Sequence, residues 1–222
     1  MVLNKIFQPF RSLLIVGVAH FALLACGGSV GQVGSGGDQS GEGDHGSMAV
    51  MDHSSMDLGP ADETFDLRFI DAMIPHHEGA VVMAQEALQK STRSEIQQLA
   101  EAIIQAQDQE ISEMKAWRRD WYPNVSEEPV MYSAEMGHTM PMTEEMRSAM
   151  MMAGDLGTAD EQFDLRFLQA MIPHHQGAID MAQQVLEKSD RPPVKELAQG
   201  IIDSQQKEID QMKQWQKDWY GQ

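Results

Sequence analysis

Cysteine is almost absent from this chain of 222 residues: Cys26 is the only one. No disulfide can therefore form within the chain. If Cys26 serves another purpose, any soft metal ligand in the protein has to be methionine.

Basic residues are also scarce, with 16 Lys and Arg against 34 Asp and Glu, for a formal net charge of −18. A protein that contacts phosphates needs Lys and Arg, so this balance argues against nucleic acid as a partner. It favours cations as partners, although a well-solvated acidic surface is the alternative reading of the same composition.

Long apolar runs are missing except near the N-terminus, where SLLIVGVAHFALLA follows the basic Lys5 and Arg11. This run is too short to span a membrane as a mature helix and has the layout of a secretory signal peptide over residues 1–25. Cys26 directly follows the small Ala25, as in a bacterial lipobox. We therefore predict that Cys26 is lipidated; a plain signal peptide with an incidental cysteine is the alternative.

A lipidated Cys26 predicts a membrane-anchored protein that faces the periplasm. Gly27, rather than Asp, follows the cysteine. By analogy with bacterial sorting rules, this favours the outer membrane.

Aromatic residues number only 14, whereas methionine reaches 18. Many of these methionines lie in segments that a hydrophobic core does not explain. Residues 26–57 are rich in Gly, Ser and Asp and are expected to form a disordered leader. The leader contains His45, Met48, Met51, His53 and Met56.

A second Met-rich segment connects two repeats. Phe65–His77 matches Phe163–His175, and the offset of 98 (163 − 65) holds without a gap from Leu58/Leu156 to Tyr122/Tyr220. The helical domain at 58–222 is therefore divided into repeat one (58–122), a connector (123–155) and repeat two (156–222). The connector residues that we consider as further metal ligands are Met136, His138, Met140 and Met142.

Each repeat is predicted to form two amphipathic helices joined by a short turn. Apolar residues recur every three or four positions, for example at Phe65, Phe69 and Met73 in the first helix and Leu99 and Ile103 in the second. Neither hairpin can bury its apolar stripe alone. The pattern therefore predicts an all-α protein, an antiparallel four-helix bundle made of two tandem hairpins. No strand is expected. A short helix within 143–153 is an alternative explanation for part of the connector methionine.

The segment AMIPHH occurs in both repeats, at 72–77 and 170–175. A proline inside a helix costs roughly 3 kcal/mol, and the glycine that follows one turn later adds about 1 kcal/mol relative to alanine. At least one histidine of each pair must point into the bundle. A single core histidine is commonly a structural residue, but two pairs with nearby methionine and small residues favour metal ligation.

Helix geometry places further groups near the first pair. Met73 lies three residues before His76 and four before His77, which are neighbouring positions on a helix. Met83 leans back toward His76 across the small residues Gly79 and Ala80. Across the hairpin, Gln107 and Glu110 are expected at the level of these residues. A buried carboxylate bonded to the far nitrogen of a metal-bound histidine would satisfy both groups. The corresponding residues of repeat two are Gln205 and Glu208.

Thioether and imidazole ligands together suit Cu(I), while histidine can also hold Cu(II). Silver(I), which is softer, is expected to bind the same sites. Copper is therefore the expected metal, with Cu(I) favoured. Methionine binds Cu(I) without forming disulfides, which suits a site outside the cytoplasm.

The Phe-x-x-x-Met-x-x-His-His motif, followed by Gly-Ala, Met-Ala and a closing Met-x-x-Trp, resembles the CopM-type copper-binding family over residues 58–222. The resemblance implies a ferritin-like fold and a periplasmic or secreted protein that binds copper and contributes to copper resistance. A copper exporter or another periplasmic copper protein would then be its protein partner. The metal ligands it implies are Met73, His76, His77, Met83, Met114, Met171, His174, His175, Met181 and Met212.

Two other functions are alternatives to a non-enzymatic copper protein. A ferritin-like di-iron oxidase needs Glu-x-x-His motifs on its long helices. Here those motifs occur only at Glu42–His45 and Glu135–His138, outside the long helices, and Glu110 and Glu208 are too few carboxylates. A structural lipoprotein with a Met-rich core leaves the leader and connector methionines unexplained.

Overall fold

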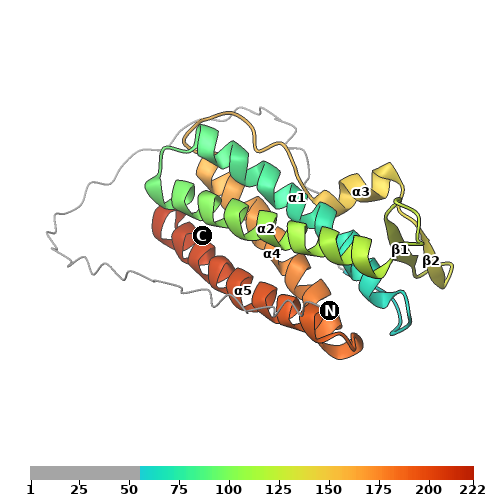
Figure 1. The fold of residues 1–222 in the computed structure, drawn as a ribbon. Helices are drawn as coiled ribbons and strands as arrows, with labels where there is room; N and C mark the ends of the chain where they lie inside the picture. Colours follow the sequence, from blue (N-terminus) through green and yellow to red (C-terminus); the bar gives the residue numbers. More distant parts are fainter. Residues whose placement is uncertain (1–55) are drawn as a thin grey trace, which may run out of the picture. The chain divides into compact units, whose positions relative to one another are not determined.

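The computed structural model describes residues 56–222. Four long helices form most of this part of the chain (Figure 1). Their bounds are α1 Phe65–Lys90, α2 Ser94–Trp121, α4 Phe163–Lys188 and α5 Pro192–Tyr220; between them lie β1 Val130–Ser133, β2 His138–Pro141 and α3 Glu144–Met151. The predicted all-α class is confirmed. The bounds of α4 lie 98 residues after those of α1 at both ends (163 − 65 and 188 − 90).

The long helices form two antiparallel hairpins, α1–α2 and α4–α5 (Figure 1). The hairpins meet mainly through α1 and α4, which run in opposite directions. Phenylalanines at the start of both helices anchor the core: Phe65, Phe69, Phe163 and Phe167 are at most 1% exposed. At about 25 cal/mol per Å² of buried apolar surface, such side chains hold the bundle together without a metal.

The helix ends follow local chemistry. Helix α2 ends two residues before Pro123. Helix α5 carries proline in its first turn, and its C-cap is Gly221, whose φ is 69°. A capping box of Ser94 with Gln97 fits the sequence, but the structure does not form it. Ser94 is already helical, and Gln97 Nε2 instead donates to the carbonyl of Ser91, 2.8 Å away.

In each hairpin, an arginine in the turn between the two helices contacts an aspartate and a tryptophan of the other hairpin. Arg93 Nε lies 3.2 Å from Asp164 Oδ2, and its guanidinium is 4.4 Å from the ring centroid of Trp219. The equivalent set is Arg191, Asp66 and Trp121, with distances of 3.1 Å and 4.5 Å. These paired contacts join the two hairpins at both ends.

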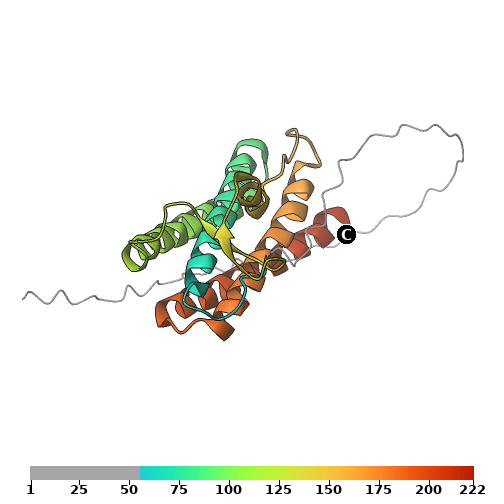
Figure 2. The same ribbon diagram turned by 90° about the vertical axis from the view of Figure 1, so that its right-hand side faces the viewer.

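The expectation that the chain has no strand is wrong. β1 and β2 form an antiparallel hairpin, with Met131 opposite Met140. The hairpin and α3 both lie against α1 (Figure 2). Val130 N donates to Asp71 Oδ2 on α1 at 2.9 Å, so this hairpin depends on a helix 59 residues away, which a local pattern does not reveal.

The short helix considered within 143–153 is confirmed as α3. Thr143 is its N-cap, and the Thr143 hydroxyl accepts from Met146 N at 3.2 Å. The helix ends at Met151, and its C-cap Met152 has a left-handed φ of 48°. No helix among residues 56–222 is long and apolar enough to cross a membrane.

Candidate metal centre

The two His-His pairs meet where α1 packs against α4. The ring centroids of His76 and His174 lie 3.9 Å apart, with the ring planes tilted by 48°. His77 and His175 are the outer members of the two pairs. The ring centroid of His77 lies 6.4 Å from that of His76, and the ring centroid of His175 lies 6.3 Å from that of His174. All four residues are fully buried. The two repeats therefore bring four imidazoles into one buried region.

Small residues allow this close approach. A Cβ on Gly177 would lie 3.1 Å from Nε2 of His76 and 3.2 Å from Cε of Met56. A Cβ on Gly79 would overlap the carbonyl oxygen of Met151. The glycine one turn after each His-His pair therefore makes room for groups from outside its own hairpin.

Each outer histidine is held by a glutamate of the same hairpin. Nε2 of His77 lies 2.7 Å from Oε2 of Glu110, and Nε2 of His175 lies 2.7 Å from Oε2 of Glu208. An imidazole N–H donates to the carboxylate, so the other ring nitrogen, Nδ1, carries the lone pair. The hydrogen bonds expected between these glutamates and histidines are present. They orient each ring and make Nδ1 the nitrogen available to a metal ion.

Most of the remaining ring nitrogens have no hydrogen-bond partner among the described residues. His174 Nε2 is an exception, because it donates to the carbonyl of Met151 at 3.2 Å. The buried nitrogens without a partner are Nδ1 of His76, His77, His174 and His175 and Nε2 of His76. Buried polar atoms are normally satisfied, and an unsatisfied one costs about 1–3 kcal/mol. Five such atoms in one region are typical of a site that binds a ligand.

The central histidines are neutral at pH 7. Burial, reinforced by the neighbouring imidazoles, lowers the pKa of His174 to about 3. The same causes hold the pKa of His76 well below its usual 6.5. A neutral imidazole has a lone pair, so no proton has to leave these two rings before a metal binds.

The six helix methionines identified from the sequence are all fully buried. They fall into two groups, each with members from both hairpins. Met73, Met114 and Met181 belong to one cluster of packed side chains, whereas Met83, Met171 and Met212 belong to the other. Met83 therefore packs within the cluster that contains Met171 and Met212 of the second hairpin, which the sequence does not indicate.

Gln107 and Gln205 are also buried, as expected for residues on the inner faces of α2 and α5. Their side-chain oxygens have no hydrogen-bond partner within residues 56–222. Histidine, cysteine and carboxylate side chains of the described residues form no group of three or more that could hold a metal ion. A metal centre here therefore depends on the methionine sulfur atoms.

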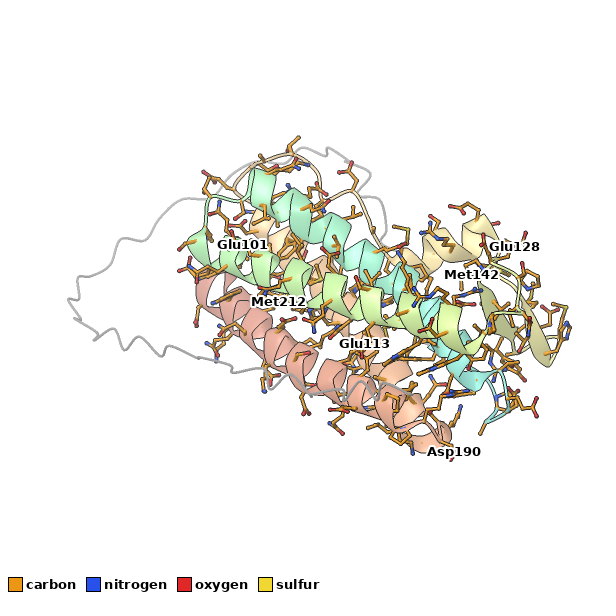
Figure 3. All side chains as sticks on the ribbon, viewed as in Figure 1. Glu101, Glu113, Glu128, Met142, Asp190 and Met212 are labelled. Atoms are coloured by element: carbon orange, nitrogen blue, oxygen red, sulfur yellow. The ribbon has the colours of Figure 1, made fainter. Side chains whose placement is uncertain are left out.

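Connector and leader residues occupy different environments. Met56 is 4% exposed and packs against repeat two, so it belongs with the helical domain rather than with the leader. In the connector, Met136 and His138 are exposed, Met140 is partly exposed and Met142 is buried at the junction of β2 and α3 (Figure 3). Cys26, His45, Met48, Met51 and His53 lie outside the described residues.

Two features near the histidines do not follow from the sequence pattern. The first is the Met151 carbonyl on His174, and the second is Met150, which is 6% exposed and lies in the same cluster as Met73. The run of methionine at 150–152 was the available signal. Its position against α1 depends on α3 and could not be read from the run itself.

Comparison with known proteins decides the family. The profile of DUF305, a domain of unknown function, matches residues 32–216. The chain belongs to this family. The resemblance to CopM is confirmed as well: the structure of CopM in the Cu(II)-bound form is 41% identical, covers 70% of this chain and 97% of CopM, and has a TM-score of 0.56.

Further matches to solved structures and to a curated protein are consistent with that family assignment. The Cu(I)-bound form of CopM matches at 37% identity over the same shares of both chains, with a TM-score of 0.53. A DUF305 fragment from Deinococcus radiodurans is 30% identical, with 69% of this chain and 95% of the fragment covered and a TM-score of 0.51. Uncharacterized protein L153 of Acanthamoeba polyphaga mimivirus is 45% identical over 49 residues, which span 22% of this chain and 32% of L153.

Proposed function

We propose that this protein binds copper inside its helical domain, with Cu(I) as the main form. One observation carries the proposal: each outer histidine donates Nε2–H to a glutamate and keeps a buried Nδ1 without a partner. A hydrogen-bonded carboxylate of this kind typically orients a metal-binding histidine and raises its basicity. A purely structural histidine would be expected to use both nitrogens.

The grouping of methionines suggests two equivalent sites. His77 would bind with donors from the cluster that contains Met73, Met114 and Met181. His175 would bind with donors from the cluster that contains Met83, Met171 and Met212. His76 and His174, whose ring centroids lie 3.9 Å apart, would be available to either site.

The donor set explains the choice of metal. Thioethers are soft ligands and imidazole is intermediate, a combination that favours Cu(I) and Ag(I) over harder ions. Solved structures of CopM contain Cu(II), Cu(I) or Ag, which supports copper as the cargo of this chain. A di-iron oxidase is disfavoured because Glu110 and Glu208 each bond a different histidine, and no cluster of carboxylates forms among residues 56–222.

We further propose that the protein is a periplasmic lipoprotein that sequesters or carries copper, rather than an enzyme, and thereby contributes to copper resistance. The lipobox at Cys26 and the strongly acidic composition support this location and cargo. A protein that exchanges copper with an exporter or another periplasmic protein would use the same sites. Cu(II) would be held through the histidines.

Metal selectivity tests the proposed function. Protein beginning at residue 26, with Cys26→Ser to remove the thiol, is titrated with Cu(I), Ag(I), Fe(II) and Mn(II) in the absence of oxygen. Cu(I) and Ag(I) are expected to bind far more tightly than the other two, because thioethers are poor ligands for harder ions. Recovery of the protein with two irons and oxidase activity would contradict the proposal.

Fractionation of cells tests the proposed location. Wild-type protein is expected in the membrane fraction and to carry lipid on Cys26, whereas Cys26→Ser is expected to be soluble or incompletely processed. A wild-type protein found wholly in the soluble periplasmic fraction would rule out the lipid anchor.

A further inference from the structure

The β-hairpin of the connector places methionine and histidine on one face. In its register, Met131 lies directly opposite Met140, and Ser133 lies opposite His138. Successive residues of a strand point to opposite sides. Met131, Met140, Ser133 and His138 therefore share one face of the hairpin, while Tyr132 and Thr139 share the other.

The Tyr132 face packs against the start of the helical domain. A Cβ on Gly59 would lie 2.5 Å from the ring of Tyr132, and the Arg68 guanidinium is 5.6 Å from the centroid of that ring. Arg68 Nη1 also donates to Thr139 Oγ1 at 2.8 Å. The face with Met131 and Met140 consequently points away from this contact.

The methionines of this face are not part of the core. Met131 and Met140 are partly exposed, His138 is exposed, and neither methionine belongs to the two buried clusters of the described residues. Methionine usually fills gaps in a core. That explanation does not apply to side chains that sit outside the core and partly in solvent.

The three potential ligands lie within reach of one ion. Residues directly opposite in an antiparallel pair have Cβ atoms about 4.5–5.5 Å apart, and diagonal neighbours about 7–8 Å apart. Met131 and Met140 form such a direct pair, and His138 is the diagonal neighbour of Met131. Two flexible thioethers and an imidazole can therefore converge from this face.

A hydrogen bond selects the nitrogen of His138 that would bind. Nδ1 lies 3.1 Å from the carbonyl oxygen of Met136, so Nδ1 carries the proton and donates it. Nε2 is then the nitrogen with the lone pair. A backbone carbonyl on Nδ1 is a common way to fix the tautomer of a metal-binding histidine.

We propose that Met131, Met140 and Nε2 of His138 form a second, solvent-facing site for a soft monovalent ion, Cu(I) or Ag(I). The proposal rests on the proposed function, since it assumes that the protein handles such ions. It adds an accessible site outside the bundle, built from two thioethers and one imidazole. A set of this kind lacks the carboxylates that harder ions prefer.

The test is a titration with Ag(I), which does not change oxidation state, followed by NMR of ¹³C-methyl methionine and of the histidine rings. The protein starts at residue 26 and carries Cys26→Ser. The methyl signals of Met131 and Met140 and the ring signals of His138 are expected to shift together as one ion binds. In Met131→Leu/Met140→Leu, the His138 shift is expected to disappear and the number of bound Ag(I) ions to fall by about one.

A matched control removes two thioethers from α3 and its C-cap. Met146→Leu/Met152→Leu is expected to keep the coupled shifts of Met131, Met140 and His138. Circular dichroism verifies that both variants remain folded, and leucine preserves the apolar volume of each position. Without such a control, loss of binding and loss of structure could be confused.

The outcomes separate this inference from the proposed function. If the rings of His77 and His175 respond to Ag(I) but Met131 and Met140 do not, the hairpin site is refuted and the buried sites stand. If Met131, Met140 and His138 respond while the buried histidines do not, the hairpin site is supported and the proposed buried sites are refuted. Independent shifts of Met131 and Met140, at different Ag(I) concentrations, would also overturn a shared site.

Discussion

His76 and His174 lie with their ring centroids 3.9 Å apart, although 98 residues (174 − 76) separate them in the chain. Their contact joins the two hairpins at the level of the histidine pairs. Both rings are neutral and buried, and neither Nδ1 has a hydrogen-bond partner among the described residues. The interface between the repeats therefore also contains the two imidazoles that are available to both proposed copper sites.

The glutamates that hold His77 and His175 are expected to control copper affinity without binding copper. Glu110→Gln and Glu208→Gln remove the negative charge but keep the volume, so the imidazoles become less basic and less firmly oriented. We expect about a 10–100-fold loss of Cu(I) affinity at each altered site. Competition with a Cu(I) chelator measures it.

Glu113→Gln is the matched control, since Glu113 lies on the same helix as Glu110 and makes no hydrogen bond to a histidine in the described structure. Its Cu(I) affinity should equal that of the wild type. If Glu110→Gln and Glu208→Gln bind Cu(I) as tightly as Glu113→Gln, the Glu–His hydrogen bonds do not influence metal affinity.

The stability of the apo-protein is expected to fall with acid below pH 6.5. The unfolded chain takes up protons on His76 and His174 near pH 6.5, but the folded state does not, because its histidine pKa values are lowered, to about 3 for His174. Below pH 6.5, each such histidine reduces the free energy of unfolding by up to about 1.4 kcal/mol per pH unit, and for His174 this loss continues down to about pH 3. Urea unfolding at several pH values measures this slope.

The variant His76→Gln/His174→Gln separates these histidines from the other titrating groups. Its slope of stability against pH, between pH 6.5 and pH 5, should be shallower than that of the wild type. Identical slopes would mean that the two buried histidines do not account for the acid sensitivity.

The two glycines after the histidine pairs are expected to differ in their tolerance of alanine. At Gly79, a Cβ would overlap the Met151 backbone carbonyl, so α3 would have to move. Overpacking of this kind costs about 1–3 kcal/mol, which exceeds the gain of about 1 kcal/mol in helix propensity. At Gly177, the neighbours are the ends of the Met56 and His76 side chains, which can adjust.

Thermal unfolding of the two apo-variants checks this difference. Gly79→Ala should melt several degrees below Gly177→Ala. If Gly177→Ala were the less stable of the two, the contact of Met151 with α1 would not be the limiting one.

The fold was predictable wherever the pattern is local. The apolar residues of Phe65–Lys90 repeat with helical spacing, and the same pattern recurs without a gap at Phe163–Lys188, which predicts two similar hairpins. The link from His77 to Glu110 followed from the register of a hairpin. Met83 was different, because its packing with Met171 depends on how one hairpin lies on the other, and no helical spacing encodes that.

The connector was less predictable for the same reason. Asp71 stabilises β1 through a hydrogen bond, and Gly59 and Arg68 contact its Tyr132. These three partners of the strand lie in the first repeat. The four residues of β1 carry too little alternation to indicate a strand. The position of Met151 against Gly79 likewise depends on where α3 docks.

The measurement that tests the account most directly is a Cu(I) titration of a variant with all four bundle histidines, His76, His77, His174 and His175, replaced by glutamine. Circular dichroism and melting are followed on the same samples. Copper is expected to raise the melting temperature of the wild type, since any ligand of the native state does so. The variant should stay helical, lose the tightest copper sites and gain less thermal stability from copper. Unchanged tight binding in the variant would contradict the account, because the buried histidines would then be structural.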